Sequence, residues 1–216
     1  MSKVVAEITM SLDGFVAGPN ATLELPLGEG GEQLHDWAVE LAAWRERHGK
    51  EGGGQNADSE RMARAVEATG AVVMGRRMFS GGEGPWESDP NADGWWGDDP
   101  PFRVPVFVLT HHPRATVQKQ GGTTFTFVED GIESAVEQAK AAAGERNVSV
   151  AGGASAIQQA VRAGLVDELE LHIAPLLLGS GTRLFDDLGP DDAALERVDV
   201  VGSPKVTHIT YRVRNA

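Results

Sequence analysis

The sequence predicts an α/β protein with a mixed, mainly parallel sheet, helices on both faces of the sheet and an antiparallel C-terminal hairpin. Short apolar runs at 71–74, 105–109 and 148–151 are bounded by turns, which is typical of parallel strands buried between two layers of helices. Segments with apolar residues at helical spacing lie between these runs. The last third of the chain instead alternates polar and apolar residues, as half-buried strands do.

In chain order, the first expected element is a strand over 3–10, where β-branched and polar residues mix. A loop follows over 11–20, because this segment holds two glycines, a proline and an asparagine. Apolar residues at helical spacing then predict helices over 31–48 and 59–69. The stretch between these helices is rich in glycine, and we expect it to be mobile.

The second half of the chain alternates helices with strands. A helix is expected over 131–143, where Asp130 and Glu133 form an N-terminal capping pattern. Another helix is expected over 154–163. A Gly-Ser-Pro segment between the last two strand candidates predicts a hairpin. The strands expected in the last third lie at 167–174, 194–201 and 205–213.

Length and composition favour one globular domain spanning 1–216. A chain of 216 residues that is 41% hydrophobic and 24% charged fits an ordinary soluble domain. One segment departs from this average, because residues 81–103 form an acidic stretch rich in glycine, proline and tryptophan. A loop of this length is usually functional or disordered. We expect Trp86, Trp95 and Trp96 of this insertion to form a lid or a dimer contact.

Net charge and cysteine content exclude several functions. A formal net charge of −13 argues against nucleic acid and membrane surfaces as partners, since both require a surplus of Lys and Arg. No apolar run approaches the roughly 20 residues of a membrane-spanning helix. The lack of cysteine excludes disulfides, thiolate metal sites and thiol catalysis, so these features favour the cytoplasm. A phosphate-bearing ligand would depend on a few local arginines and on backbone amides.

Three turns that follow predicted parallel strands are candidates for ligand binding, because open α/β sheets bind ligands at the carboxyl ends of their strands. The first is Gly75-Arg76-Arg77-Met78. The glycine lets the backbone approach a ligand closely, and either arginine can grip a phosphate with two hydrogen bonds. The alternative is an ordinary turn with two solvated arginines.

The second candidate turn runs from Leu109 through Thr110, His111 and His112 to Arg114. Its hydroxyl, imidazoles and guanidinium could surround an adenosine ribose and its 2′-phosphate. Adjacent histidines also suggest a metal, but no third ligand lies at a recognisable spacing, so no metal is predicted. A solvated loop is the alternative.

The third candidate turn is Gly152-Gly153-Ala154-Ser155, between a buried strand and a helix. This geometry directs unpaired amides and the positive end of the helix dipole at an anion. The pattern is neither the G-x-G-x-x-G fingerprint nor a Walker loop. A tight packing turn and a phosphate cradle both remain open.

Taken together, the order of these motifs resembles one family. The motifs are Met10-Ser11-Leu12-Asp13-Gly14, Val73-Met74-Gly75-Arg76, Val108-Leu109-Thr110, Gly152-Gly153, Ala174-Pro175, Gly179-Ser180-Gly181 and Leu184-Phe185. They resemble the dihydrofolate-reductase-like superfamily, and within it the reductase domain of the bacterial riboflavin-pathway deaminase–reductase and its stand-alone relatives. The similarity covers nearly the whole chain, and no deaminase or zinc motif is present.

The resemblance implies NADPH as the cofactor. The first turn would contact the NADPH phosphates, the second would lie near the 2′-phosphate, and the third would hold the pyrophosphate. The first strand and the loop to Gly18 would lie beside the nicotinamide. The implied cofactor-binding residues are Ala6, Gly18, Gly75, Arg76, Arg77, Met78, Leu109, Thr110, His111, Gly152, Gly153, Ala154 and Ser155.

Two departures from the family pattern affect the site. Met78 stands where relatives commonly carry a threonine, so one hydroxyl contact is missing or replaced. Insertions at about 24–57 and 81–103 are longer than compact members need. We expect them to remodel the substrate mouth, so the substrate does not follow from the resemblance.

The catalytic and substrate candidates are few. Asp13, in the loop that leaves the first strand, is the first candidate for a polar group near the reaction centre, and a turn residue bonding to nearby backbone is the alternative. Asp36 or Glu40 lies where a folate reductase places its acid. Trp37 could stack on a heterocycle, although core packing is the more common fate. Pro175 completes the expected substrate contacts.

Three functions remain open at this stage. The favoured one is an NADPH-dependent reductase of a small heterocycle, either pterin-like or similar to 5-amino-6-(5-phosphoribosylamino)uracil. The second is a reductase of an unrelated small molecule, and the third is a non-catalytic nucleotide-binding module. The expected partners are a small-molecule substrate and, because the C-terminal sheet edge is antiparallel, a second copy of the chain in a two-fold homodimer.

Overall fold

The computed structural model describes residues 2–214, which contain eleven strands and six α-helices. The strands are β1 (Val4–Ser11), β2 (Phe15–Ala17), β3 (Thr69–Gly75), β4 (Pro105–Leu109), β5 (Val117–Gln118), β6 (Thr124–Val128), β7 (Asn147–Gly152), β8 (Glu168–Ala174), β9 (Thr182–Arg183), β10 (Ala194–Gly202) and β11 (Thr207–Arg214). The helices are α1 (Asp36–Val39), α2 (Ala42–Arg47), α3 (Ala57–Ala68), α4 (Arg76–Ser80), α5 (Gly131–Ala143) and α6 (Ala154–Arg162), with short 3₁₀ helices η1 (Gly31–His35), η2 (Trp86–Ser88) and η3 (Gln120–Gly122). Over this range, no helix is long and apolar enough to cross a membrane.

Nine strands form one sheet in the order β10-β11-β8-β1-β7-β3-β4-β6-β5, and β2 pairs with β9 in a separate small sheet. The strands from β8 to β6 in this order are parallel. The antiparallel β10–β11 hairpin extends one edge, and β5 pairs antiparallel at the other. The predicted fold class and the predicted C-terminal hairpin are confirmed.

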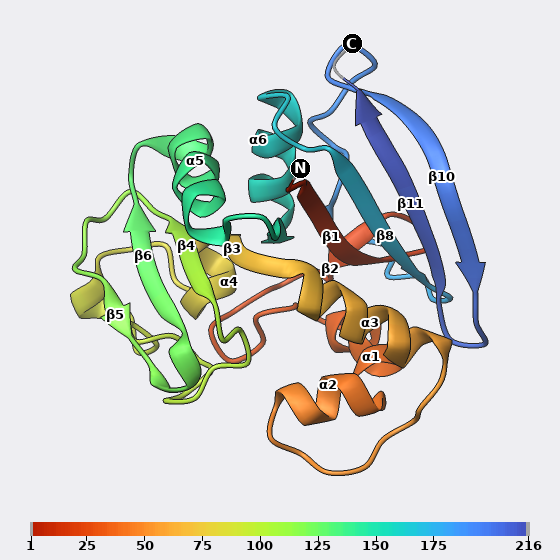
Figure 1. Cartoon of the computed structure of the whole chain (residues 1–216), viewed down its shortest axis with the longest axis horizontal. Coiled ribbons are helices and arrows are strands. Elements are labelled where there is room, and N and C mark those ends of the chain that lie inside the picture. The colour runs from red at the N-terminus through yellow and green to blue at the C-terminus, as the bar shows by residue number, and fades with distance from the viewer. Residues whose placement is uncertain (1, 215–216) are drawn as a thin grey trace.

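Helices cover both faces of this sheet (Figure 1). On one face, α5 and α6 pack on β1, β3 and β7, and their apolar side chains form the largest core cluster. α1, α2 and α3 lie on the other face. There Trp37, Ala38, Leu41 and Val206 form a smaller cluster. The sheet therefore separates two apolar clusters.

The insertion 81–103 folds back onto the sheet. Trp86 packs edge-on against Phe79 and Phe127, with ring centroids 6.0 and 4.9 Å away. Trp96 packs against Phe125 and Phe102 in the same cluster. Both indoles therefore contribute to the core of the described structure, whereas the sequence suggested a lid or a dimer contact.

The predicted helix over 31–48 is wrong as a single element, because the structure divides it into η1, α1 and α2. Leu41 adopts an extended conformation (φ −75°, ψ 143°) and forms a bridge with Gly54. The Ala42 amide donates to the Gly54 carbonyl, and the Gly54 amide donates to the Glu40 carbonyl. Because these bonds compete with helical ones, they break the helix. They also anchor the glycine-rich stretch, which the sequence had suggested to be mobile.

α3 begins earlier than predicted, and α5 begins where predicted but without the predicted cap. α3 begins at Ala57, because the Asn56 side chain accepts a hydrogen bond from the Ser59 amide and caps the helix. α5 has the predicted bounds, but Asp130 makes no side-chain capping bond. Its backbone (φ −80°, ψ 16°) lies outside the extended region that N-cap residues adopt, so the capping pattern was misread.

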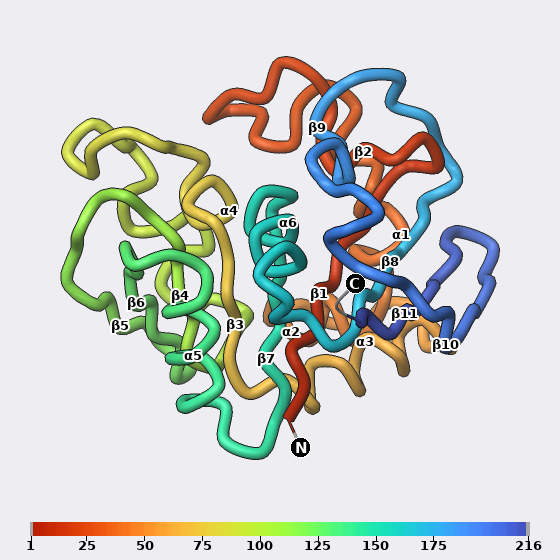
Figure 2. The backbone as a smooth tube through the Cα atoms, turned by 90° about the horizontal axis from the view of Figure 1, so that it is seen from above, coloured from red at the N-terminus to blue at the C-terminus, as the bar shows by residue number. Residues whose placement is uncertain are grey.

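The parallel register places the segments that follow the strands at one edge of the molecule. Figure 2 shows the loop after β1, α4 after β3 and α6 after β7 on the side away from the N-terminus. Because parallel strands end at the same edge, the three predicted ligand-binding turns share this edge.

Phe79 is the centre of the aromatic cluster that holds the insertion, and its side chain is fully buried. We expect Phe79→Ala to lower the free energy of unfolding by about 3–5 kcal/mol, because it leaves a cavity among packed rings. Urea unfolding followed by tryptophan fluorescence measures this loss. Leu177→Ala is the control, since Leu177 is 70% exposed and should change stability by less than about 0.5 kcal/mol. A loss from Phe79→Ala as small as the control's would contradict the packing of the insertion.

Candidate active site

The two candidate turns that contain glycine meet at the carboxyl ends of β3 and β7. Met74 lies opposite Gly152 in the sheet register. A Cβ atom on Gly75 would lie 3.9 Å from both the Gly152 carbonyl oxygen and the Gly153 amide nitrogen. The Met78 sulfur lies 3.6 Å from the position of a Cβ on Gly152. We call Gly75, Met78, Gly152 and Gly153 the glycine cradle.

The first turn of α6 opens onto this cradle. Gly153 is the N-cap of α6, and no side chain caps the helix start. The amides of Ala154 and Ser155 are therefore without a side-chain cap, and the positive end of the helix dipole lies beside them. Ser155 is exposed, and the Gly152–Gly153 peptide bond is cis. The uncapped start of α6 suits an anion such as a pyrophosphate.

The turn after β4 adjoins the cradle. Leu109 pairs with Gly75 across the sheet. Thr110 is buried, and its hydroxyl oxygen accepts a hydrogen bond from the His112 amide at 3.1 Å. His111 is exposed. The structure therefore brings Leu109 next to the cradle, while the Thr110 hydroxyl shapes the turn.

The two arginines of the first turn have different environments. The Arg76 side chain is 7% exposed and pairs with Asp89 of the insertion at 2.6 Å. Arg77 is 69% exposed and pairs with Glu83 at 2.5 Å. The alternative of two solvated arginines is therefore wrong for Arg76, because the insertion encloses its guanidinium, and the role of either arginine at a phosphate stays a prediction. Arg77 is the accessible cation of this turn.

Asp13 connects the loop after β1 to the loop after β8 through hydrogen bonds. Its carboxylate accepts hydrogen bonds from the Ser11 hydroxyl at 2.6 Å and from the amides of Leu178 and Gly179 at 3.1 and 2.7 Å. The bond from Ser11 and those two amides lower the pKa of Asp13 to about 2. A carboxylate held in this way is a poor proton donor near neutral pH. The structure therefore favours a positioning role for Asp13 over the catalytic role suggested by the sequence.

The remaining predicted residues lie on separate elements around the same edge. Ala6 is fully buried on β1, opposite Val150 of β7. Gly18 lies in a loop where a Cβ atom would meet the Glu29 carbonyl oxygen at 1.9 Å, so its lack of a side chain serves loop packing. Pro175 is exposed just after β8, and Asp36 is exposed at the start of α1. Their roles at cofactor and substrate stay predictions.

Trp37 is a core residue. Its side chain is 7% exposed, and its ring lies 5.1 Å from His172 and 5.2 Å from His208 between ring centroids. The indole nitrogen donates to the Thr9 hydroxyl at 3.4 Å. The suggestion that Trp37 stacks on a substrate is corrected, because the indole already covers two histidines.

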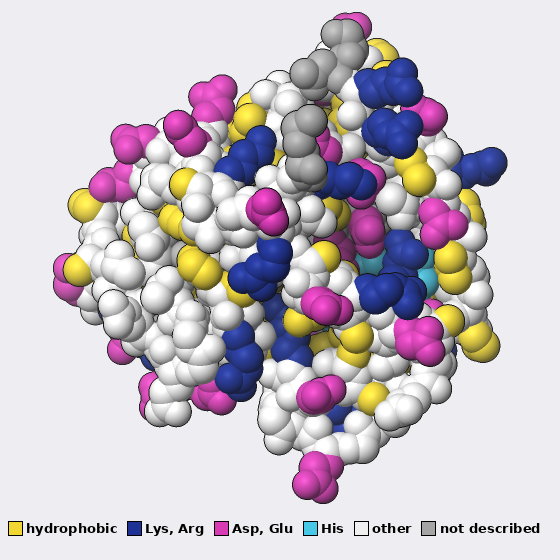
Figure 3. Space-filling view, viewed as in Figure 1, with side chains coloured by type: hydrophobic (Ala, Val, Ile, Leu, Met, Phe, Trp, Pro, Cys, Tyr) yellow, Lys and Arg dark blue, Asp and Glu magenta, His cyan; other side chains and the backbone are white. Residues whose placement is uncertain are grey.

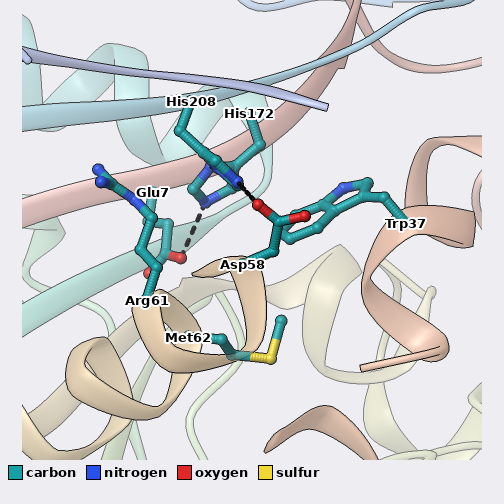
Figure 4. A pocket seen from close by; sticks show the side chains of 7 residues that line it. All are labelled: Glu7, Trp37, Asp58, Arg61, Met62, His172 and His208. Carbon is teal, nitrogen blue, oxygen red and sulfur yellow. Dashed lines mark hydrogen bonds and ion pairs between the residues drawn. The ribbon is translucent and has the colours of Figure 1, made fainter. Parts of the chain in front are cut away.

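Beneath Trp37 lies a chain of buried hydrogen bonds that the sequence did not predict. Asp58 of α3 bonds to His208 Nε2 at 3.1 Å, and His208 Nδ1 contacts His172 Nδ1 at 2.8 Å (Figure 4). His172 Nε2 in turn bonds to Glu7 of β1 at 2.9 Å. We call Asp58, His208, His172 and Glu7 the buried polar chain. It links α3 to three neighbouring strands.

The protonation of this chain is constrained by its geometry. At the Nδ1–Nδ1 contact one ring must donate and the other accept, so the contact is lost when both histidines are fully protonated. Burial and the charge of His172 lower the pKa of His208, against the opposing bond to Asp58. Burial raises the pKa of Glu7, but the hydrogen bond and charge of His172, with the charges of Arg47 and Arg61, outweigh it and lower that pKa overall.

Arg61 supplies the positive charge on the α3 side. It donates to Thr210 at 2.7 Å and pairs with Glu170 and Asp199 at 3.3 and 3.4 Å. Burial and the charge of Glu7 raise the pKa of Glu170. On the face seen in Figure 3, histidine is visible only as small areas beside basic side chains.

A metal at this place is not favoured. Glu7, Glu170 and His172 have candidate ligand atoms within 4.8 Å of one another. However, His172 already bonds to Glu7 and Arg61 already pairs with Glu170. The cavity among these groups is about 10 Å³, about the room of one water molecule. We assign no metal, and no substrate fits here.

The sheet, the turns at three neighbouring strand ends and the C-terminal hairpin are those of the dihydrofolate-reductase-like oxidoreductases. The model of the RibD C-terminal domain family matches residues 2–208, so the chain belongs to that family.

Several proteins are similar over most of the chain. The uncharacterized protein YyaP of Bacillus subtilis (strain 168) is 33% identical over 196 residues, covering 86% of this chain and 81% of YyaP. The crystal structure of a putative riboflavin biosynthesis protein from Shewanella sp. PV-4 has a TM-score of 0.62 at 19% identity and covers 99% of both chains. Dihydrofolate reductase from Enterococcus faecalis, complexed with NADP(H), has a TM-score of 0.53 at 15% identity, over 99% of this chain and 97% of that one. The two structures show the shared fold.

The buried polar chain predicts that the free energy of unfolding depends on pH. Unfolded histidine binds a proton near pH 6.5, whereas the folded protein resists protonation of His208. The unfolded state therefore binds more protons as pH falls below about 6.5, and the free energy of unfolding decreases by at most about 1.4 kcal/mol per pH unit for this proton. Urea unfolding at about pH 7.5 and about pH 5.5 measures the decrease.

His208→Asn should reduce this pH dependence, whereas His111→Asn, at an exposed position, should preserve it. Desolvation also lowers the pKa of His35 and of His48, which act with the same sign, so the difference between the two variants is the decisive quantity. Equal pH dependence in both variants would show that His208 does not carry the effect.

Proposed function

We propose that this protein is an NADPH-dependent reductase of a small heterocyclic compound. The observation that carries the proposal is the glycine cradle beside the uncapped start of α6, with Leu109 in register next to Gly75. Three backbone turns converge there, so a ligand can approach amides closely at the carboxyl edge of the sheet. This arrangement suits an extended diphosphate better than a compact polar substrate.

The residues present fit such a cofactor. Gly75 has no Cβ where the Gly152 and Gly153 backbones approach it, and the amides of Ala154 and Ser155 would receive the pyrophosphate. Arg77 would add a charge-assisted contact from the exposed side. When bound, the cofactor supplies a hydride to the substrate, and the protein's task is to bind and orient both.

Similar proteins support the cofactor class. The Enterococcus faecalis dihydrofolate reductase of the same fold is complexed with NADP(H). The Shewanella protein is described as a putative riboflavin biosynthesis protein. These likenesses favour a pterin-like substrate or one similar to 5-amino-6-(5-phosphoribosylamino)uracil, and the two insertions favour a substrate mouth that differs from those of relatives.

Parallel calorimetric titrations with NADPH, NADH and NADP⁺ test the proposal. We expect selective binding of NADPH. Arg77→Ala and Arg114→Ala should each weaken NADPH binding roughly ten-fold or more, because each removes a charge-assisted contact to a phosphate. Arg64→Ala is the matched control, since Arg64 is exposed on α3 and pairs only with Glu60 among the described residues.

The outcomes separate the three functions left open by the sequence. NADPH binding with oxidation in the presence of a heterocyclic substrate supports the proposed reductase. Oxidation only with unrelated carbonyl compounds supports the second function, and binding without turnover supports a nucleotide-binding module. Wild-type protein that binds none of the three nucleotides contradicts the proposal.

We also propose a homodimer through the β10 edge. β10 is the outermost strand, and its Leu195, Val198 and Val200 side chains are 47–49% exposed. Exposed apolar side chains on an edge strand favour pairing with a second strand. Light scattering after size-exclusion chromatography should give twice the chain mass, and Leu195→Glu with Val200→Glu should give the monomer. A monomeric wild type contradicts the dimer without affecting the reductase.

A further inference from the structure

Three arginines lie at the proposed cofactor edge, and each pairs with an acid of the insertion 81–103. Arg76 pairs with Asp89 at 2.6 Å, and Arg77 with Glu83 at 2.5 Å. Arg114, in the turn after β4, pairs with Asp93 at 2.6 Å. In a chain with a net charge of −13, these arginines are the local positive charge on which phosphate binding depends.

The Asp89 carboxylate is surrounded by hydrogen-bond donors, as a bound anion would be. Its carboxylate accepts from the Arg76 guanidinium, from the Ser80 hydroxyl at 2.7 Å and from the Asn91 amide at 2.8 Å. Gly82 leaves room for this carboxylate, because a Cβ at Gly82 would lie 2.6 Å from an Asp89 oxygen. A guanidinium, a hydroxyl and a backbone amide are also the donors that phosphate oxygens use.

The guanidinium of Arg76 is nevertheless only partly satisfied. Its Nε and Nη2 are buried without a hydrogen-bond partner. They face the Trp86 ring, whose centroid lies 3.5 Å from the guanidinium carbon. Buried donors without acceptors are unfavourable, so the contacts with the insertion do not fully satisfy the Arg76 guanidinium.

Trp86 and Asp93 also contact Arg114, which lies in the turn after β4. The Arg114 guanidinium lies 5.0 Å from the centroid of the Trp86 ring, and the Trp86 indole donates to the His112 carbonyl at 3.0 Å. Asp93 is 75% exposed, while its partner Arg114 is 22% exposed. The insertion thus places one indole and two carboxylates over the arginines that follow β3 and β4.

We propose that the insertion is an internal competitor for the 2′-phosphate of the cofactor, and that Asp89 and Asp93 determine how strongly the protein discriminates NADPH from NADH. This inference rests on the proposed function. A dianionic 2′-phosphate must displace these carboxylates from Arg76 and Arg114, whereas a cofactor without that phosphate leaves them in place. The acids therefore reduce the affinity for NADPH and leave that for NADH unchanged.

Asp93→Asn is the primary test, because the exposed position tolerates the change without loss of the fold. The probes are adenosine 2′,5′-bisphosphate and adenosine 5′-monophosphate, which differ by the 2′-phosphate, followed by NADPH and NADH. Calorimetry should show the bisphosphate and NADPH binding roughly two- to five-fold more tightly to the variant, as expected for release of one exposed ion pair. The monophosphate and NADH should bind as they do to the wild type.

The matched control is Asp98→Asn, an exposed acid of the same insertion that pairs with Lys119. It lowers the net negative charge equally, so a gain seen in both variants would be a general charge effect and would overturn the proposal. In an Arg114→Ala background, Asp93→Asn should have no effect, because the competition acts through Arg114. Unchanged or weaker bisphosphate binding by Asp93→Asn would also overturn it.

Hydrogen exchange gives a second, independent measurement. Saturating bisphosphate should increase amide exchange in residues 82–93, because the acids are displaced, whereas the monophosphate should not. Unchanged or slower exchange contradicts displacement. If NADPH binds the wild type but Asp93→Asn changes nothing, this inference fails and the reductase stands. If no nucleotide binds the wild type or Asp93→Asn, the proposed function fails.

Discussion

The parallel register of β1, β7, β3 and β4 is the constraint on which the candidate site depends. It brings the carboxyl ends of these strands to one edge, so that turns about 75 residues apart in sequence meet through their backbones at Gly75 and Gly152. Neither position contributes a side chain to this contact, and Gly152 has a φ of 124°, which favours glycine there. The start of α6 then adds its amides without further rearrangement.

Charge distribution is the second determinant of the site. An acidic protein that binds a polyphosphate must concentrate its positive charge locally. Here the arginines after β3 and β4 do lie at the proposed cofactor edge, yet acids of the insertion are paired with them and Trp86 lies against two of them. The same insertion also completes the aromatic core around Phe79. The acids that pair with the arginines and the rings that complete the core therefore belong to the same segment.

On the face of the sheet that α3 covers, polar side chains are buried together. Polar residues of β1, β8 and β11 face α3, and they are satisfied by one another and by Asp58 and Arg61. A buried polar group is tolerated only with partners, so this network fixes α3 on the sheet, and Trp37 excludes water above it. The cavity left is too small for a substrate.

The fold class, the C-terminal hairpin and the three turns after parallel strands could be predicted from the sequence, because apolar runs, alternation and turn residues are local signals. The sequence did not reveal the buried polar chain: His172 and His208 sit at alternating strand positions, but only the pairing of β8 with β11 places them together. Likewise, the helix break at Leu41 depends on Gly54, and the enclosure of Arg76 depends on Asp89. These features required tertiary structure, because each is a contact between segments whose separation in space no local pattern specifies.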